Sequence, residues 1–369
     1  MKLAVTILVT CVGALLALGL VMLYSSSMAQ TGAHDLVRQL TWCAPGLLVC
    51  VLVASLDYTR LRAWALPAFV VAVILLAAVL VFGVVRGNAR RWFSFGGMSF
   101  QPSEFCKLAL ILALAWYGER YQRHIGTFRY GILIPGFCLA VVLALIFREP
   151  DVGTTILLAA LAGGILLVAG VRWRFVLPLS LVVAVGVGIF LWFDDMRRNR
   201  ILSWQDLDNS KDGVGYQAYQ GMLALGSGGI FGLGLGDGRQ KLGFIPEHHT
   251  DFIFSVIGEE LGLVATMLVV VAFVAIVLCG LYISLNAREP FGLLLGSGIT
   301  FLIGLQAFIN LGVVTSALPN KGLPLPFISY GGSSLVVMLA AVGLMLSIAR
   351  HAQVPIRPPA NPFESPIAP

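Results

Sequence analysis

Ten apolar runs of roughly membrane-spanning length constrain this chain more than any other feature of its sequence. A transmembrane helix needs about 20 apolar residues to cross about 30 Å of hydrocarbon. The runs cover residues 3–24, 36–55, 64–85, 104–118, 130–147, 152–170, 175–193, 252–284, 291–314 and 332–349. Only 11% of the residues are charged, against roughly 25% in soluble domains. We therefore expect an all-α polytopic membrane protein with about ten transmembrane helices.

The runs fill the chain so completely that they predict one transmembrane domain, residues 1–350, and no soluble domain. One long outer loop covers about 194–250, and the proline-rich residues 351–369 predict a short disordered cytoplasmic tail. The first run exceeds the roughly 7–15 apolar residues of a secretory signal, so we expect an uncleaved span. All six cysteines lie inside runs, without disulfide or zinc spacing, and are expected to pack as small apolar residues.

The arginines predict which side of the membrane each connection faces, because cytoplasmic connections are enriched in Lys and Arg. With the N-terminus in the cytoplasm, the inside connections and the tail hold Arg60, Arg62, Arg120, Arg123, Arg129, Arg172, Arg174, Arg288, Arg350 and Arg357. Outside the long loop, the opposite side still holds Arg38, Arg86, Arg90, Arg91, Arg148 and Lys321. We therefore expect both termini in the cytoplasm and an anionic ligand at the outer face.

An acid and a base stand at the outer start of the fourth run. Pro102 suits the first helical turn, and Glu104 is then favoured beside the positive end of the helix. Lys107 lies three residues later, on the same helix face. Charges in an apolar helix should be paired and turned away from lipid. They form either a structural ion pair that braces the bundle or a cation that its acid positions in a cavity.

Three further outer segments carry motifs. The turn Arg148-Glu149-Pro150-Asp151 either caps the next helix or lines the outer cavity. In the long loop, residues 216–225 are typical of a surface amphipathic helix, and the glycine-rich residues 226–238 predict a flexible re-entrant or gating segment. Residues 318–334 hold three prolines and three glycines, which predict a rigid non-helical crossing that is buried in protein or faces water.

The densest group of ionisable residues is Glu247-His248-His249-Thr250-Asp251, at the mouth of the eighth run. Glu259 and Glu260 follow about two helical turns below. The two histidines lack metal-ligand spacing, so we expect no zinc site. Asp251 is either the N-cap of the eighth span or a general base whose pKa is raised by the neighbouring acids.

These motifs, in this order, resemble the SEDS family of cell-wall polymerases (shape, elongation, division and sporulation), which includes FtsW and RodA. The resemblance covers nearly the whole chain. It is carried by ARRWFSFGGMSFQPSEFCK, REPDVGTT, GYQAYQGMLALGSGGIFGLGLG, FIPEHHTDFIFSVIGEELG and NKGLPLPFISYGGSS. Within the family, GEELG and NKGLPLPFISYGGSS are more similar to FtsW, of cell division, than to RodA, of cell elongation.

The resemblance implies an inverting peptidoglycan glycosyltransferase of the cytoplasmic (inner) membrane, which polymerises lipid II, the undecaprenyl-pyrophosphate-linked precursor, at the outer face. It implies catalytic roles for Asp251, Glu104 and Lys107. The expected substrate-binding residues are Arg90, Arg91, Glu149, Asp151, His249, Lys321 and Ser329. The expected partners are a class B penicillin-binding protein transpeptidase and other divisome or elongasome membrane proteins, and no nucleic acid. No cofactor and no resident metal site is expected, although Mg²⁺ or Mn²⁺ could assist.

Two other classes of function stay open on the sequence. A transporter that flips the same lipid-linked precursor would use charged or broken helices near the midplane. Here the acids and cations gather on the outer side and the inner halves of the runs are nearly uncharged, which favours an outward-facing enzyme. A scaffold for partner proteins would explain the helices but not the group at Glu247–Asp251. A RodA-type polymerase of cell elongation is the alternative within the family.

Overall fold

The computed structural model describes residues 1–27, 32, 34–86, 89–95, 98–206, 213, 215–241 and 249–352. All ten apolar runs are helical: α1 (Lys2–Ser27), α2 (His34–Ser55), η1 with α3 (Tyr58–Trp64, Ala65–Phe82), α4 (Pro102–Arg120), η2 with α5 (Arg129–Leu133, Ile134–Arg148), α6 (Val152–Val168), α7 (Trp173–Phe193), α10 (Ile253–Leu285), α11 (Pro290–Val314) and α12 (Gly332–His351). Within the described residues, seven helical segments are long and apolar enough to cross a membrane, and α6 is a shorter apolar helix. The predicted polytopic helical fold is confirmed.

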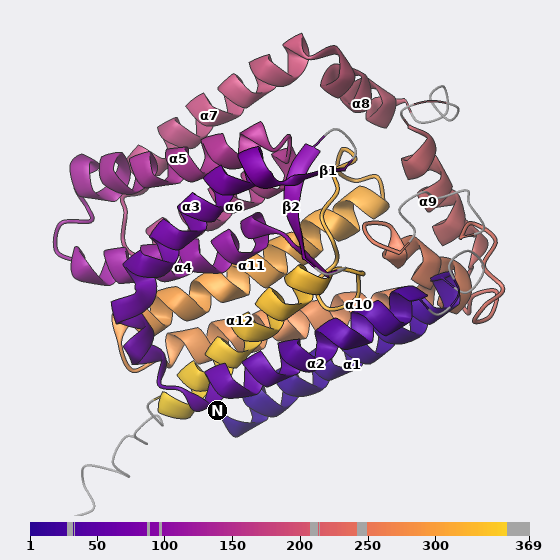
Figure 1. Ribbon diagram of the computed structural model, residues 1–369, viewed down its shortest axis with the longest axis horizontal. Coiled ribbons are helices and arrows are strands. Elements are labelled where there is room, and N and C mark those ends of the chain that lie inside the picture. Colours follow the sequence, from indigo (N-terminus) through magenta and orange to yellow (C-terminus); the bar gives the residue numbers. More distant parts are fainter. Residues whose placement is uncertain are drawn as a thin grey trace, which may run out of the picture.

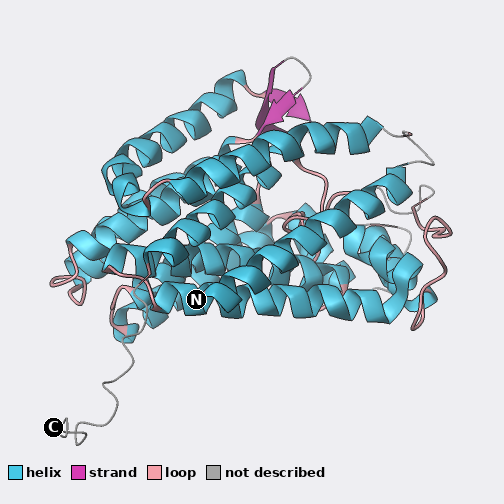
Figure 2. Cartoon of the chain, turned by 90° about the horizontal axis from the view of Figure 1, so that it is seen from below, coloured by secondary structure: helices cyan, strands magenta, loops and turns pink. Residues whose placement is uncertain are grey.

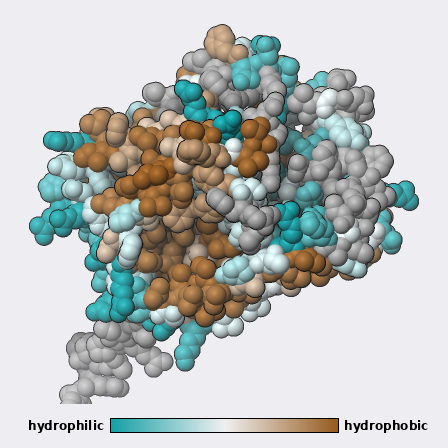
Figure 3. All heavy atoms as spheres, viewed as in Figure 1, coloured by the Kyte–Doolittle hydropathy of each residue, from teal (hydrophilic) through white to brown (hydrophobic). Residues whose placement is uncertain are grey.

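The long helices run side by side in one bundle (Figures 1 and 2). α11 and α12 are the most enclosed of the candidate spans, with 67% of their apolar window buried, against 17–28% in the other five. The N-terminus and the last turn of α12 lie at the same end of the bundle, as an even number of spans requires (Figure 1). Apolar residues cover the flank seen in Figure 3 and hydrophilic residues gather at its edges, as expected of a bundle surrounded by lipid.

A small antiparallel sheet stands between α3 and α4. It consists of β1 (Val84–Arg86), β2 (Ala89–Phe95) and β3 (Met98–Phe100), in the order β1-β2-β3. Its register pairs Val85 with Arg90 and Ser94 with Ser99. The sheet fixes the direction in which Arg90 and Arg91 leave the backbone, so this outer connection is an ordered support.

The described part of the long loop holds two short helices, α8 (Asp195–Gln205) and α9 (Tyr216–Ser227). The prediction of a helix at residues 216–225 is confirmed by α9, whereas α8 was not predicted. The indole of Trp204 in α8 donates a hydrogen bond to the carbonyl of Ser316 (2.7 Å), which ties α8 to the end of α11. Glu247 and His248, and the tail beyond residue 352, lie outside the described residues.

Candidate active site

The predicted pair of charges in α4 is present and buried. Pro102 occupies the first turn, and the Nζ of Lys107 lies 2.8 Å from Oε1 of Glu104. Only 3% of Glu104 and none of Lys107 is exposed. Lys107 also donates to the amide oxygen of Gln306 in α11 (3.0 Å). Because the ammonium is shielded and already bonded, a substrate can touch it only if one of these partners moves.

Two amide side chains of α11 carry the polar connection onward. Gln306 donates from Nε2 to the carbonyl of Pro324 (2.8 Å). Asn310, one turn later, donates from Nδ2 to the carbonyls of Leu323 (2.7 Å) and Asp251 (2.8 Å). Gln306 is fully buried and Asn310 is 1% exposed. We name Glu104, Lys107, Gln306 and Asn310 the α4–α11 polar network; through the adjacent carbonyls of Pro324 and Leu323 it connects the α4 ion pair to the backbone of Asp251.

The crossing at residues 318–331 packs against the segment that carries Asp251. Ser329 donates from Oγ to the carbonyl of Thr250 (2.6 Å) and accepts from the amide of Leu325 (2.8 Å). The amide of Tyr330 donates to the carbonyl of His249 (3.0 Å), and the two rings lie 5.8 Å apart. Of the two predicted alternatives, burial in protein holds for the middle of this crossing, since Leu323, Leu325, Phe327 and Ile328 are all at most 4% exposed.

Asp251 itself is partly exposed and lies one residue before Phe252, the N-cap residue of α10. The interpretation of Asp251 as the N-cap of the eighth span is therefore wrong. Its Oδ2 faces Gly322: a Cβ added at Gly322 would lie 2.6 Å from that oxygen. A side chain at position 322 would therefore displace the Asp251 carboxylate from its present position.

Arg90 and Arg91 are tied to the ends of neighbouring helices. Arg90 donates to the carbonyl of Val81 in the last turn of α3 (3.0 Å). Arg91 donates to the carbonyls of Glu149 (2.7 Å) and Pro150 (2.8 Å) in the turn between α5 and α6. Both guanidinium groups thus position the sheet, and their role in binding substrate stays a prediction.

The turn between α5 and α6 uses its two acids differently. Asp151 is the N-cap of α6 and accepts from the amide (3.0 Å) and hydroxyl (2.9 Å) of Thr154, so the capping alternative holds for this residue. Glu149 is fully buried, and neither of its carboxyl oxygens has a hydrogen-bond partner among the described residues. Burial, with the nearby charge of Asp151, raises the pKa of Glu149 to about 8. Burial therefore favours the neutral form of Glu149 at neutral pH.

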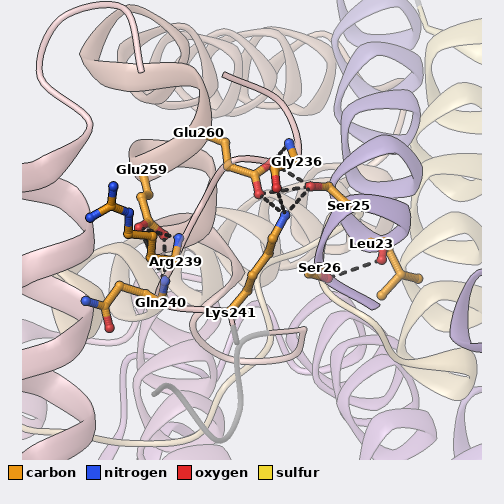
Figure 4. Close-up of polar contacts among 9 residues, drawn as sticks. All are labelled: Leu23, Ser25, Ser26, Gly236, Arg239, Gln240, Lys241, Glu259 and Glu260. Atoms are coloured by element: carbon orange, nitrogen blue, oxygen red, sulfur yellow. Dashed lines mark hydrogen bonds and ion pairs between the residues drawn. The ribbon is translucent and has the colours of Figure 1, made fainter. Parts of the chain in front are cut away.

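Glu259 and Glu260 hold the glycine-rich segment (Figure 4). Glu260 accepts from Nζ of Lys241 (2.6 Å), from Oγ of Ser25 in α1 (2.6 Å) and from the amide of Gly236 (3.1 Å). Glu259 accepts from the amide of Arg239 (2.8 Å). Among the described residues, neither carboxylate has a hydrogen bond to Asp251, so these acids anchor a loop. The segment that the sequence suggested was flexible is fixed at several points.

Lys321 borders a cavity of about 210 Å³ beside the crossing. Arg200 of α8 lines the same cavity. Its other walls are mainly apolar and come from α6, α8, α11 and the crossing: Gly153, Ile156, Ile201, Ile309, Val313, Leu318, Pro319 and Asn320. The surface of this cavity is almost entirely apolar, so it suits a hydrocarbon chain, and Lys321 and Arg200 line it mainly with their carbon stems.

No group of three or more His, Cys, Asp or Glu side chains is close enough to hold a metal ion in the part of the chain that the structure describes. A role for Mg²⁺ or Mn²⁺ stays a prediction.

Sequence reasoning missed Gln306 and Asn310, which join the two halves of the site. Their signal was present, because two amides one turn apart in an apolar helix need buried partners. It also missed Ser25 and Lys241, whose partner Glu260 lies 235 and 19 residues away in the sequence.

Comparisons with known proteins agree with this geometry. The model of the family described as cell cycle proteins, comprising FtsW, RodA and SpoVE, matches residues 5–354. The chain is 40% identical over 348 residues to a protein of Geobacter metallireducens named "Probable peptidoglycan glycosyltransferase FtsW", covering 91% of this chain and 92% of that one.

Two solved structures have the same fold. One, from work on how a peptidoglycan synthase complex coordinates polymerization and crosslinking, has a TM-score of 0.79 and 32% identity, covering 93% of this chain and 96% of that chain. The other is the rod shape determining protein RodA of Thermus thermophilus, with a TM-score of 0.70 and 31% identity over 94% and 97% of the two chains. The chain therefore belongs to the FtsW/RodA/SpoVE family of cell cycle proteins and is closer to FtsW than to RodA.

Proposed function

We propose that this chain is an FtsW-type peptidoglycan glycosyltransferase that polymerises lipid II into glycan strands at the outer face of the cytoplasmic membrane, during septal cell-wall synthesis. Its relatives carry this activity in their names. The observation in the structure that supports it best is the α4–α11 polar network, which joins a buried ion pair to the backbone of a partly exposed aspartate, Asp251. That arrangement offers a proton acceptor at the surface of a rigid polar support.

The reaction sets the requirements for the site. The C4 hydroxyl of the acceptor sugar attacks C1 of the donor with inversion, a C4–O–C1 bond forms, and the bond from C1 to the pyrophosphate oxygen breaks. The hydroxyl proton needs a base, and the departing pyrophosphate takes the electron pair and needs cations.

Asp251 is the base in this proposal. Asn310 holds its carbonyl, and Ser329 holds the carbonyl of the preceding Thr250. Fixing the backbone on both sides sets the direction in which the side chain leaves it, which favours a near-attack geometry once the acceptor hydroxyl is bound. The carboxylate lies against Gly322, so the acceptor sugar approaches beside the crossing.

The cations divide into two groups. Lys107 is buried and bonded on two sides, so we assign its charge a positioning role together with Glu104. Lys321 and Arg200 border the cavity of about 210 Å³, whose apolar walls suit the first isoprene units of a lipid carrier. We assign these two residues to the pyrophosphate of the donor.

The partner in this proposal is a class B penicillin-binding protein, whose transpeptidase crosslinks the strands as they form. The similar solved structure comes from work on a complex in which polymerization and crosslinking are coordinated, which supports such a pairing. Other divisome membrane proteins would join the same assembly.

The test of the function uses purified wild-type protein in vesicles loaded with lipid II, alone and with its cognate transpeptidase. Glycan polymer and movement of lipid II across the bilayer are measured on the same sample. We expect polymer with the transpeptidase present. Movement of lipid II without polymer under any condition would instead identify a transporter.

The proposed orientation places both termini in the cytoplasm, because nine arginines of the described connections lie at that end: Arg60, Arg62, Arg120, Arg123, Arg129, Arg172, Arg174, Arg288 and Arg350. Gln122→Cys and Asp237→Cys, each in a background without native cysteines, test it. Both side chains are exposed, at opposite ends of the bundle. A membrane-impermeant maleimide should label position 237 in intact cells and position 122 only after lysis; the reverse result would invert the topology.

A further inference from the structure

The two connections at the end of the bundle away from Asp251 form one packed surface. They are residues 121–128, between α4 and η2, and residues 169–172, between α6 and α7. Ile125 from the first and Val171 from the second are each only 3% exposed. The rings of Phe128 and Phe175 meet edge to face, 5.7 Å apart. The two connections therefore hold each other in place.

Arginines crowd this surface. We name it the arginine surface and define it by its five exposed members: Arg120, Arg123, Arg129, Arg172 and Arg174. Residues 120–133 and 169–175 contain no Asp or Glu. The nearest acid in the sequence is Glu119, whose carboxylate pairs with Arg62 (2.8 Å). Among the described residues, none of the five arginines has an ion pair, so no carboxylate in that part of the chain neutralises their charge.

Aromatic rings surround these charges. Phe128 is 54% exposed and Trp173 is 62% exposed. The guanidinium groups of Arg129 and Arg174 lie over the rings of Tyr130 (5.8 Å) and Phe175 (4.9 Å). Exposed aromatic rings at helix ends are typical of the membrane–water interface. We therefore expect the arginines at the depth of the lipid phosphates.

We propose that the arginine surface binds the phosphate headgroups of anionic phospholipids in the leaflet that it faces, which is the cytoplasmic one in the orientation given above. Guanidinium groups bind phosphate through paired N–H donors, and basic pockets between transmembrane helices on the cytoplasmic side bind anionic headgroups. Arg120 lies 16 residues after Glu104 on α4, about 24 Å along the helix, so this site is separate from the candidate active site.

The competing explanation for these arginines is that they only set the orientation of the helices in the membrane. The positive-inside rule requires arginines in short cytoplasmic connections but does not require two connections that interlock, lack acids and expose aromatic rings between the charges. An acidic protein partner would use the charges but not the exposed Phe128 and Trp173 at the depth of the lipid headgroups. Hydrophilic residues gather at this end of the bundle, the left edge in Figure 3, directly beside the apolar flank.

The test is native mass spectrometry of the delipidated full-length protein in detergent, titrated with phosphatidylglycerol or phosphatidylcholine of identical acyl chains. Arg172→Gln/Arg174→Gln removes two charges from the arginine surface. Arg60→Gln/Arg288→Gln is the matched control, since both residues are exposed at the same end of the bundle and outside the surface. Thermal unfolding of both variants verifies that they fold.

We expect the wild type to prefer phosphatidylglycerol and the Arg172/Arg174 variant to bind it about tenfold more weakly, with the control unchanged. An equal loss in both variants would show that only the overall charge matters and would overturn the site. Absence of any preference for phosphatidylglycerol in the wild type would overturn it as well, and would leave an acidic protein as the partner to seek.

Discussion

The ion pair between Lys107 and Glu104 is the residue-scale feature on which the site most depends. Both charges are out of water, and only Oε1 of Glu104 is bonded, since its Oε2 has no partner among the described residues. Removing one member of a buried pair leaves an uncompensated charge, which costs about 3–5 kcal/mol.

Lys107→Met should therefore lower the free energy of unfolding by about 3–5 kcal/mol, because it leaves the Glu104 carboxylate buried and unpaired. The double variant Glu104→Gln/Lys107→Met should recover most of that loss and still polymerise lipid II poorly. Thermal unfolding in detergent and polymer synthesis are the two readouts. Full activity of the double variant would show that the ion pair only stabilises the helix bundle and has no role in catalysis.

Glu149 gives the stability of the protein a dependence on pH. Its pKa lies near 8 in the folded chain, because burial disfavours the charged form, against an ordinary value of 4.5. Between those two pH values the folded state holds a proton that the unfolded state has lost. The free energy of unfolding contributed by this residue therefore falls as pH rises from about 4.5 to about 8.

Glu149→Gln should remove that dependence, because glutamine stays neutral. At pH 5 the melting temperatures of the variant and the wild type should differ little. At pH 8.5 the variant should melt about 4 °C higher than the wild type. Asp237→Asn, at an exposed acid, is the control and should follow the wild type. If the melting temperatures of Glu149→Gln and the wild type changed with pH in the same way, Glu149 would not be a buried carboxyl with a raised pKa.

The sequence could predict the α4 pair because both members lie on one helix and three residues apart. It could not predict Gln306 and Asn310 as their continuation. The carbonyls that these amides bind come from the crossing, 18 and 13 residues later in the sequence, and from Asp251, 59 residues earlier. Such partners depend on tertiary packing, which a local pattern does not encode.

At the scale of elements, the glycine-rich segment and α10 form one unit. The amides of Leu233 and Gly234 donate to the carbonyls of Glu259 (2.9 Å) and Glu260 (3.0 Å). α10 departs from helical geometry at Gly262, where φ is 76° and ψ is −171°. A Cβ at Gly262 would lie 2.3 Å from the amide nitrogen of Gly232. Glycine is required there both for the backbone conformation and for the contact.

Gly262→Ala should detach the segment, since the strained backbone alone costs about 1–3 kcal/mol and the collision adds to it. Trypsin should then cut after Arg239 or Lys241 faster than in the wild type. Mass spectrometry of the fragments measures the rate of cleavage at these two sites. Gly163→Ala is the control, because a Cβ there has no atom within 4 Å. Equal cleavage rates for Gly262→Ala and the wild type would show that the glycine-rich segment does not depend on its contact with α10 at Gly262.

The sequence predicted the long helices but not the small sheet or α8. Helices with long apolar runs were evident, since only a helix satisfies its own backbone in lipid. The sheet β1-β2-β3 was missed because two of its strands have only three residues each. α8 was missed because its first half is highly charged and because it depends on Trp204 for its attachment to the end of α11.

For the whole molecule, composition alone established a polytopic helical bundle, but not the order of helices within it. A helix that is apolar on all sides has no stripe to show which face is covered. That α11 and α12 are the most enclosed of the candidate spans came only from the structure. It explains why α11, and not a peripheral helix, carries the amides that link α4 to Asp251.

The central claim is that this bundle presents Asp251 as the base of a glycosyltransferase. The most direct test compares Asp251→Asn with Asp237→Asn in a lipid II polymerisation assay, with thermal unfolding measured on the same preparations. Asparagine keeps the size of the side chain and removes its ability to take a proton, so polymer synthesis should fall by about 10²–10⁴-fold. The melting temperature should stay near that of the wild type, and Asp237→Asn should keep full activity. Full polymer synthesis by a folded Asp251→Asn protein would contradict the account.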